Sequence, residues 1–473
     1  MERTVGARPA LPPARRARRL ERDPVVTLTG MYNVVAKLDA GSAKPATKHA
    51  VRPSNLKQNH ARPTHVEEPA LARLVRIQIV VVLLALGCAT DSEVVPGHVV
   101  RDSAGIRIVE NVHGAWSTGE AWQVMETPRL RIGIAEGDPE RQLWGVVGAR
   151  RLVDGRIVIA NGGTHELRFY DEQGTFLSAV GREGEGPGEF RAMSRLDVMS
   201  ADTLVVFDGT LRRMSVFAPN GEFVRSFPLP AIDERVFPRP RGGLFADGSV
   251  LAYTERGVEG APGSGAVIRE PGLFFRLDPH TGTAEVIGEF PIRGFYFHPR
   301  AGNVLIPFEP HPWPIAAGDV FHYGKAVAPE IGVYTMAGEL RRIIRWRQES
   351  TPVDPADVES FLEQQLARIE SEQARAAMSV ELREAYALMP VHRSRPAYSD
   401  LRVDADGQLW VAQYEPPGRE PQRWLIFDSE GRFLGPVDSP AGVTIYQIGR
   451  GFLLGRSVDE LGVERVDLYD LIR

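Results

Sequence analysis

The stretch that decides the fold is Leu167–Gly181, LRFYDEQGTFLSAVG. It predicts a β-hairpin, because an aromatic strand ending at Tyr170 meets a polar turn at Gly174 and a second apolar strand follows. The pattern recurs four times down the chain, as MSVFAPNGEFVRSF (214–227), LFFRLDPHTGTAEVIGEF (273–290), IGVYTMAGELRRIIRW (331–346) and WLIFDSEGRFLGPV (424–437). An internal repeat of this kind indicates one repeat architecture rather than several unrelated domains.

Another pair of strand signals precedes four of the five hairpins. Three of these pairs join at an Asp-Gly turn: RRLVDGRIVIAN (150–161), RGGLFADGSVLAYT (241–254) and LRVDADGQLWVAQY (401–414). Each unit then forms a four-stranded antiparallel sheet, whose two faces cannot be buried by the unit alone. Radial stacking buries them, so we predict an all-β, six-bladed β-propeller. The predicted blades are 146–181, 192–229, 240–291, 305–347, 396–437 and 442–473.

The sixth unit contains three strand signals and ends at Arg473 without a fourth. An extra strand-like segment, Trp122–Ile132, belongs to no other unit. We expect it to supply the missing outer strand, so that N- and C-terminal strands close the last blade.

The segment GREGEGPGEF (181–190), together with the Asp-Gly turns and the hairpins, resembles NHL-repeat six-bladed propellers, and in particular bacterial six-bladed β-propeller lipoproteins. The resemblance covers about residues 100–473. It implies a propeller attached to the cell envelope. Six-bladed propellers that resemble gluconolactonases or amidating lyases hold a divalent metal in the channel, but no such ligand set can be aligned to this chain.

The N-terminal region divides into three segments. Residues 1–70 are rich in Ala, Pro and Arg without periodicity, so we expect a disordered or spurious extension, with a nucleic-acid arm as the alternative. Residues 71–88, LARLVRIQIVVVLLALGC, have the basic start and short apolar run of a signal peptide, and their end resembles a lipobox. Cys88 would be lipidated, unless the run is a buried strand that ends in Cys. Residues 89–100 then form a tether, and 101–473 the propeller.

Charge changes sign at Cys88. Residues 1–87 contain 15 Lys/Arg and 6 Asp/Glu, whereas the rest contains 41 and 55, a balance of −14. An acidic body argues against nucleic acid as a partner. The chain has 1 Cys, which excludes an internal disulfide. We therefore predict an exported, monomeric protein that binds no nucleic acid and is attached to the membrane through the lipid only. Ala89 after the lipidated Cys favours the outer membrane.

Residues 352–390 do not follow the strand pattern. Asp354-Pro355 predicts a helix start, Ser379 is the predicted cap of a second helix, and the apolar residues between them have helical spacing. We expect this helical insert to rest on the rim of the propeller, or to act as a lid over the channel.

The sequence contains few motifs that indicate catalysis, phosphate binding or metal binding. The glycines at 184, 186 and 188 have neither dinucleotide nor P-loop spacing, so we interpret them as a tight connection with Phe190 packed between blades. No nucleophile-elbow or zincin motif occurs, and we assign no catalytic residue. We predict no cofactor, although binding of Ca²⁺ or Zn²⁺ stays an open alternative. The weak metal candidates are His298, His311 and His322.

The innermost strand of each blade faces the channel. Counting four and six residues back from the turns gives a set of charged channel-lining candidates for ligand binding: Arg150, Arg195, Asp197, Arg241, Asp400 and Arg402. These residues favour an anionic ligand. Two functions stay open: a non-catalytic scaffold that binds an envelope protein or a small anionic ligand, and a metal-dependent hydrolase or lyase with its site in the channel.

Overall fold

The computed structural model describes residues 97–473 except 118, 232–236, 255–264, 270, 299–301, 311–313, 370 and 416–421. The predicted segments 1–70 and 71–88, the lipidation candidate Cys88 and the tether up to residue 96 lie outside the described residues. β1 begins at His98, three residues before the predicted start of the propeller.

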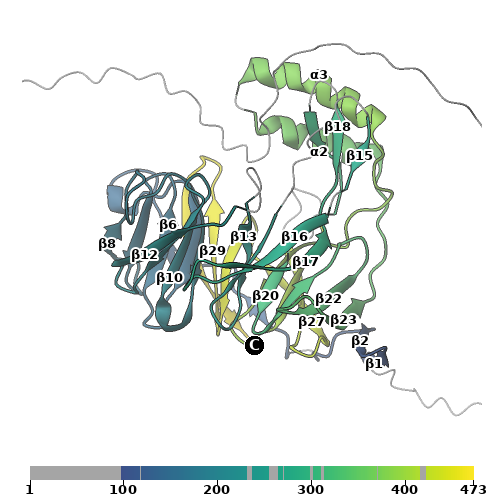
Figure 1. Cartoon of the computed structure of the whole chain (residues 1–473), viewed down its shortest axis with the longest axis horizontal. Coiled ribbons are helices and arrows are strands. Elements are labelled where there is room, and N and C mark those ends of the chain that lie inside the picture. The colour runs from purple at the N-terminus through teal and green to yellow at the C-terminus, as the bar shows by residue number, and fades with distance from the viewer. Residues whose placement is uncertain are drawn as a thin grey trace, which may run out of the picture. The chain divides into compact units, whose positions relative to one another are not determined.

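The described residues form six blades, each built on four antiparallel strands and extended in blade 4 by two further strands. Figure 1 shows these sheets with the helical insert at one side. Blade 1 contains β5 (Val146–Arg151), β6 (Ile157–Asn161), β7 (Glu166–Tyr170) and β8 (Phe176–Val180). Blade 2 contains β9 (Met193–Val198), β10 (Leu204–Asp208), β11 (Arg213–Phe217) and β12 (Phe223–Pro228). Blade 3 contains β13 (Arg239–Leu244), β14 (Val250–Tyr253), β16 (Pro271–Leu277) and β17 (Ala284–Pro291). Blade 4 contains β20 (Ile315–Ala317), β21 (Val320–Tyr323), β22 (Glu330–Thr335) and β23 (Leu340–Trp346). Blade 5 contains β24 (Tyr398–Val403), β25 (Leu409–Gln413), β26 (Gln422–Phe427) and β27 (Phe433–Ser439).

Blade 6 confirms the predicted closure. It contains β28 (Thr444–Gly449), β29 (Phe452–Val458) and β30 (Glu464–Ile472). Its outer strand comes from β3 (Gln123–Val124) and β4 (Leu130–Ile132), which both pair antiparallel with β30. The ring is therefore closed by segments more than 300 residues apart in the sequence.

Apolar layers lie between neighbouring blades and hold the ring together. Between blades 6 and 1, for example, Tyr170 packs with Leu454 and Val466. Blades 3 and 4 share an aromatic layer that includes Phe274 and Phe321. Comparable layers join blades 1 and 2, 2 and 3, 4 and 5, and 5 and 6. Side chains alternate between the two faces of a strand, so each blade presents apolar side chains on both of its faces and contributes to the layer on either side.

The turn glycines of the five repeated hairpins have two roles. All five have positive φ: Gly174 (81°), Gly221 (88°), Gly282 (74°), Gly338 (84°) and Gly431 (82°). Each also approaches the preceding blade so closely that a Cβ would meet its side chains or backbone. At Gly221 the contact would be with Phe169, at 3.0 Å. The recurring glycine is thus required for both the turn and the stacking of blades.

Two features of blade 4 were not predicted. Its first strand is β20, which begins at Ile315 and not near residue 305. The blade is also widened, because β2 (Ile106–Asn111) pairs parallel with β23, and β1 (His98–Ser103) pairs with β2. A separate three-stranded sheet lies before β20 in the chain. It consists of β15 (Val267–Ile268), from within predicted blade 3, and of β18 (Phe295–His298) and β19 (Gly302–Leu305), from between the predicted blades 3 and 4.

The insert consists of α2 (Pro355–Ala367) and α3 (Glu372–Leu388). Asp354 caps α2 as predicted, within a reciprocal capping box with Asp357. The predicted cap at Ser379 is wrong: Ser379 lies inside α3, and Ser371 caps this helix by accepting a hydrogen bond from the Ala374 amide. Sequence periodicity could not separate the two serines because both precede apolar residues with helical spacing.

Both helices pack on the three-stranded sheet, which lies beneath them in Figure 1. Leu362, Leu382 and Tyr386 from the helices form one apolar cluster with Tyr296 and Val304 from the sheet. The insert therefore rests on its own small sheet. Its action as a lid stays a prediction.

Within the described residues, no helix is long and apolar enough to cross a membrane.

Candidate functional site

The predicted channel residues come from the innermost strands β5, β9, β13 and β24. Three arginines and two aspartates of this set lie near one another. Asp197 accepts hydrogen bonds from Arg150 (2.8 Å) and from Arg195 (2.5 Å), so one carboxylate joins blades 1 and 2. We call Arg150, Arg195, Asp197, Asp400 and Arg402 the axial cluster.

Further bonds orient the guanidinium groups of the axial cluster. Arg150 also donates to the backbone carbonyl of Tyr446 at 2.9 Å, which links blade 1 to blade 6. Arg195 donates to the carbonyl of Arg241 at 2.7 Å, which links blade 2 to blade 3. The charged groups thus connect four neighbouring blades, and their positions are fixed by the ring itself.

Blade 5 contributes a second pair. Arg402 and Asp400 form an ion pair at 2.7 Å, with about a third of each side chain exposed (33% and 29%). Arg150 and Asp197 are less accessible, at 15% and 11%. Arg402 acts electrostatically on Arg150, and Arg195 on Asp400, so the pairs from blades 1, 2 and 5 share one electrostatic environment.

The two aspartates differ in pKa. Burial alone would raise the pKa of Asp197, but the guanidiniums of Arg195 and Arg150 outweigh burial and hold this pKa below its usual range. Burial also raises the pKa of Asp400, and Arg402, the Leu401 amide and Arg195 together do not offset that effect. The pKa of Arg150 is lowered by burial, only partly compensated by Asp197. With three guanidiniums against two carboxylates, the axial cluster has an excess of positive charge.

The glycine-rich segment 181–190 has the structural role predicted for it. Phe190 is fully buried in the layer between blades 1 and 2. Arg213 donates to the carbonyls of Glu185 and Gly186, both at 2.7 Å. Because this segment turns carbonyl oxygens toward a guanidinium, it does not offer the amide-lined cradle that a phosphate loop needs.

The histidine candidates do not form a common site among the described residues. His322 lies on β21, is buried, and has a pKa lowered to about 4 by burial and by the neighbouring Arg342. His298 ends β18 in the separate sheet. His311 lies outside the described residues. His298 instead lies beside Glu381 and Glu384 of α3. Sequence analysis missed this group because the histidine precedes the two glutamates by more than 80 residues. The spacing Glu-x-x-Glu on a helix was the signal for it.

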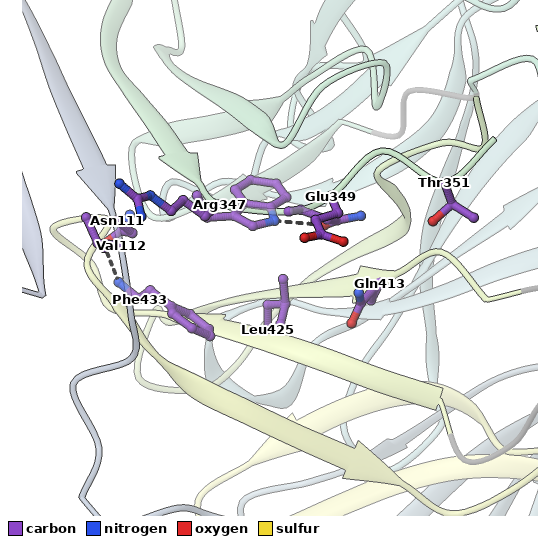
Figure 2. A pocket seen from close by; sticks show the side chains of 10 residues that line it. Asn111, Val112, Arg347, Glu349, Thr351, Gln413, Leu425 and Phe433 are labelled. Atoms are coloured by element: carbon purple, nitrogen blue, oxygen red, sulfur yellow. Dashed lines mark hydrogen bonds between the residues drawn. The ribbon is translucent and has the colours of Figure 1, made fainter. Parts of the chain in front are cut away.

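A cavity of about 340 Å³ was also missed (Figure 2). It lies away from the axis, between blades 4 and 5, and β2 contributes Asn111 to its wall. Trp346, Leu425 and Phe433 supply its apolar lining, and the exposed Arg347 and Glu349 its polar rim. Asn111 and Val112 in its wall come from the unpredicted widening of blade 4, which the repeat pattern did not indicate.

Comparisons with known proteins agree with the fold. The family DUF5128, described as a 6-bladed beta-propeller, matches residues 139–254. The chain is a six-bladed β-propeller. No curated protein matches it.

Solved structures similar to the chain are distant. A Bacteroides fragilis protein whose name describes it as exported is 12% identical, with a TM-score of 0.43 over 77% of this chain and 100% of that chain. A DUF4221 family member from Bacteroides vulgatus is 9% identical, with a TM-score of 0.43 over 74% and 99%. Virginiamycin B lyase from Staphylococcus aureus is 11% identical, with a TM-score of 0.37 over 74% and 100%.

Proposed function

We propose that the protein is a non-catalytic binding propeller of the cell envelope, and that the axial cluster binds a small anionic ligand such as a carboxylate or a phosphate ester. One observation carries the proposal. The channel-lining set on the inner strands contains four arginines, Arg241 included, against two aspartates, in a chain whose net charge after residue 87 is −14.

Guanidinium groups held in fixed directions are suited to bind carboxylate and phosphate oxygens, because each presents several N–H donors in one plane. Arg402 is the most accessible member of the axial cluster, with 33% of its side chain exposed. Its partner Asp400 is also partly exposed, at 29%, so a ligand in the channel can reach this ion pair. An incoming anion would replace Asp400 as the partner of Arg402.

The alternative, a metal-dependent enzyme with its site in the channel, has less support. Such a site needs carboxylate or imidazole groups available to the metal. Asp197 and Asp400, the carboxylates of the axial cluster, both bind guanidiniums. Guanidinium-bound carboxylates favour a non-catalytic role.

The test is isothermal titration of the purified chain with inorganic phosphate and with succinate. We expect binding of at least one probe, and about tenfold weaker binding by Arg402→Gln. Arg423→Gln is the matched control, since Arg423 lies on β26 of the same blade and pairs with Asp438 at the surface. Equal binding by both variants, or no binding of either probe by the unmodified chain, would contradict the proposal.

Attachment to the envelope is part of the same proposal. The lipobox-like end of 71–88 and Cys88 support lipidation, and Ala89 supports sorting to the outer membrane. Metabolic labelling with a radioactive fatty acid tests this: label is expected in the unmodified chain and should be absent from Cys88→Ser. Label that persists in the variant would exclude Cys88 as the lipidated residue.

A further inference from the structure

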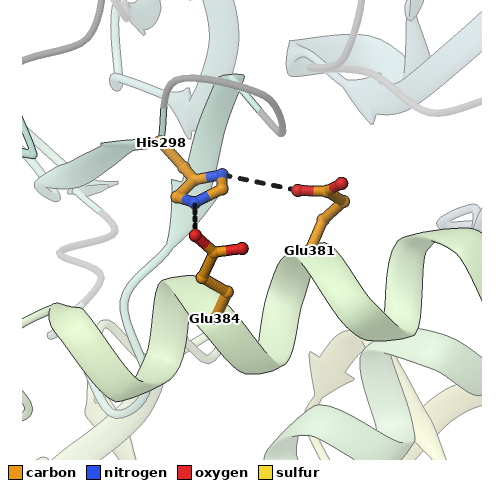
Figure 3. A group of neighbouring side chains, drawn as sticks. All are labelled: His298, Glu381 and Glu384. Carbon is orange, nitrogen blue, oxygen red and sulfur yellow. Dashed lines mark ion pairs between the residues drawn. The ribbon is translucent and has the colours of Figure 1, made fainter.

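His298, Glu381 and Glu384 bring three metal-ligating side chains together where the insert meets its sheet (Figure 3). The Nδ1 atom of His298 is 4.0 Å from Glu381 Oε2, and its Nε2 atom is 4.0 Å from Glu384 Oε1. One ligand atom from each residue lies within 4.8 Å of the others. The imidazole comes from β18 and both carboxylates from α3.

The fold holds these three groups in place independently of any ion. Glu381 and Glu384 are three residues apart, so both project from the same face of α3. Between them, Leu382 belongs to the apolar cluster that fixes α3 to the small sheet. On the sheet side, His298 is 2% exposed and follows Tyr296 of the same cluster. The imidazole is therefore presented to the helix by a rigid strand.

The donor types suit a particular class of ion. Two carboxylates against one imidazole leave the group negative whether or not the imidazole is protonated, so a cation is favoured. Imidazole nitrogen combined with carboxylate oxygen is a ligand set of Zn²⁺, whereas Ca²⁺ prefers oxygen alone. The Glu384 side chain is 46% exposed, which leaves a route for the ion and space for water.

Small adjustments would complete the coordination. Zn²⁺ takes nitrogen and oxygen ligands at about 2.0–2.2 Å, so tetrahedral ligand atoms lie about 3.4 Å apart. The two 4.0 Å separations belong to different ring nitrogens of His298, whereas one ion is bound by a single nitrogen together with both carboxylates. One such set of ligand atoms lies within 4.8 Å, so the glutamate side chains must rotate toward that nitrogen when an ion binds.

We propose that His298, Glu381 and Glu384 form a binding site for Zn²⁺ or a similar divalent transition-metal ion, which fastens α3 to β18. The site is remote from the axial cluster in the fold and does not depend on the proposed ligand. Its role is to lock the helical insert onto the three-stranded sheet.

The experiment is titration of the chelator-treated full chain with ZnCl₂, followed by calorimetry, with Co²⁺ absorption as a second readout. We expect the unmodified chain to bind one equivalent more than the variants of the site, and this equivalent to raise the melting temperature by several degrees. His298→Gln and the double variant Glu381→Gln/Glu384→Gln should weaken this binding at least about tenfold and abolish the Co²⁺ band. Glu363→Gln, an exposed carboxylate of α2, is the matched control and should bind as the unmodified chain does.

The histidines of residues 1–96 are present in every variant, so zinc bound by them contributes equally to all titrations and cancels in the comparison. The glutamate variant keeps the buried imidazole and so guards against loss of folding in His298→Gln; circular dichroism checks both. Zinc binding that is the same in all four proteins overturns the proposal, as does a site that takes Ca²⁺ in preference to Zn²⁺.

Discussion

The layers between blades and the axial cluster are built by the same strands but have opposite chemistry. On β5, Ala149 is buried while the next residue, Arg150, belongs to the axial cluster. On β9, Leu196 lies in the layer between blades 1 and 2, and its neighbours Arg195 and Asp197 bond to each other at the axis. Alternation along a strand thus places apolar layers and charged groups at neighbouring positions, and we expect the layers to contribute more to stability than the axial cluster does.

The largest loss of stability is expected when β30, the strand that closes the ring, is removed. β30 contributes Leu468 to the layer between blades 6 and 1, and Leu471 to the layer between blades 5 and 6. Deletion of residues 464–473 therefore removes parts of two layers and the partner of β4. We expect loss of the cooperative thermal transition, measured by circular dichroism.

The matched deletion is that of residues 97–103, which contain β1. This terminal strand pairs only with β2 at the outer edge of blade 4 and is largely exposed. Its removal should lower the melting temperature by only a few degrees. Similar melting curves for the two deletions would show that closure by β30 does not hold the ring.

A smaller effect is expected from a cavity in one layer. Phe274 is fully buried and contacts the rings of Phe290, Phe321 and Tyr323. Phe274→Ala should lower the free energy of unfolding by about 3–5 kcal/mol, measured by urea denaturation. Val286→Ala, at a 57% exposed position of the same blade, should change it by less than about 0.5 kcal/mol. Equal losses would contradict the assignment of stability to the layers.

The smallest effects on stability are expected from substitution of the two aspartates of the axial cluster. The folded pKa of Asp197 is lowered, so its charge stabilises the fold above pH 4 and this contribution disappears as pH falls. The folded pKa of Asp400 is raised, so its charge costs stability at neutral pH and the cost disappears on acidification. Asp197→Asn should therefore lower the free energy of unfolding by about 2–3 kcal/mol at pH 7, whereas Asp400→Asn should raise it by about 1 kcal/mol or less.

Urea denaturation at pH 7 and pH 3 measures both variants. At pH 3 the difference between Asp197→Asn and the unmodified chain should shrink. A larger loss for Asp400→Asn than for Asp197→Asn at pH 7 would reverse the assignment of the two carboxylates.

The repeat determined how much could be predicted. Hairpins such as 167–181 recur with the same turn glycine, so the six blades, the closure by 122–132 and the positions of the channel residues followed from spacing. The small sheet could not be predicted, because its strands 267–268, 295–298 and 302–305 are short and carry no repeat. Without the small sheet, neither the surface that supports the insert nor the partners of His298 could be predicted.

The pairing of β4 with β30 also constrains the order of events during biosynthesis. β4 leaves the ribosome before any complete blade, yet its partner is translated after the other five blades. Ring closure must therefore wait until translation has passed residue 468, which makes this contact slow to form. If the chain is exported as proposed, this delay leaves it open for threading through a translocation channel, and folding is completed on the far side of the membrane.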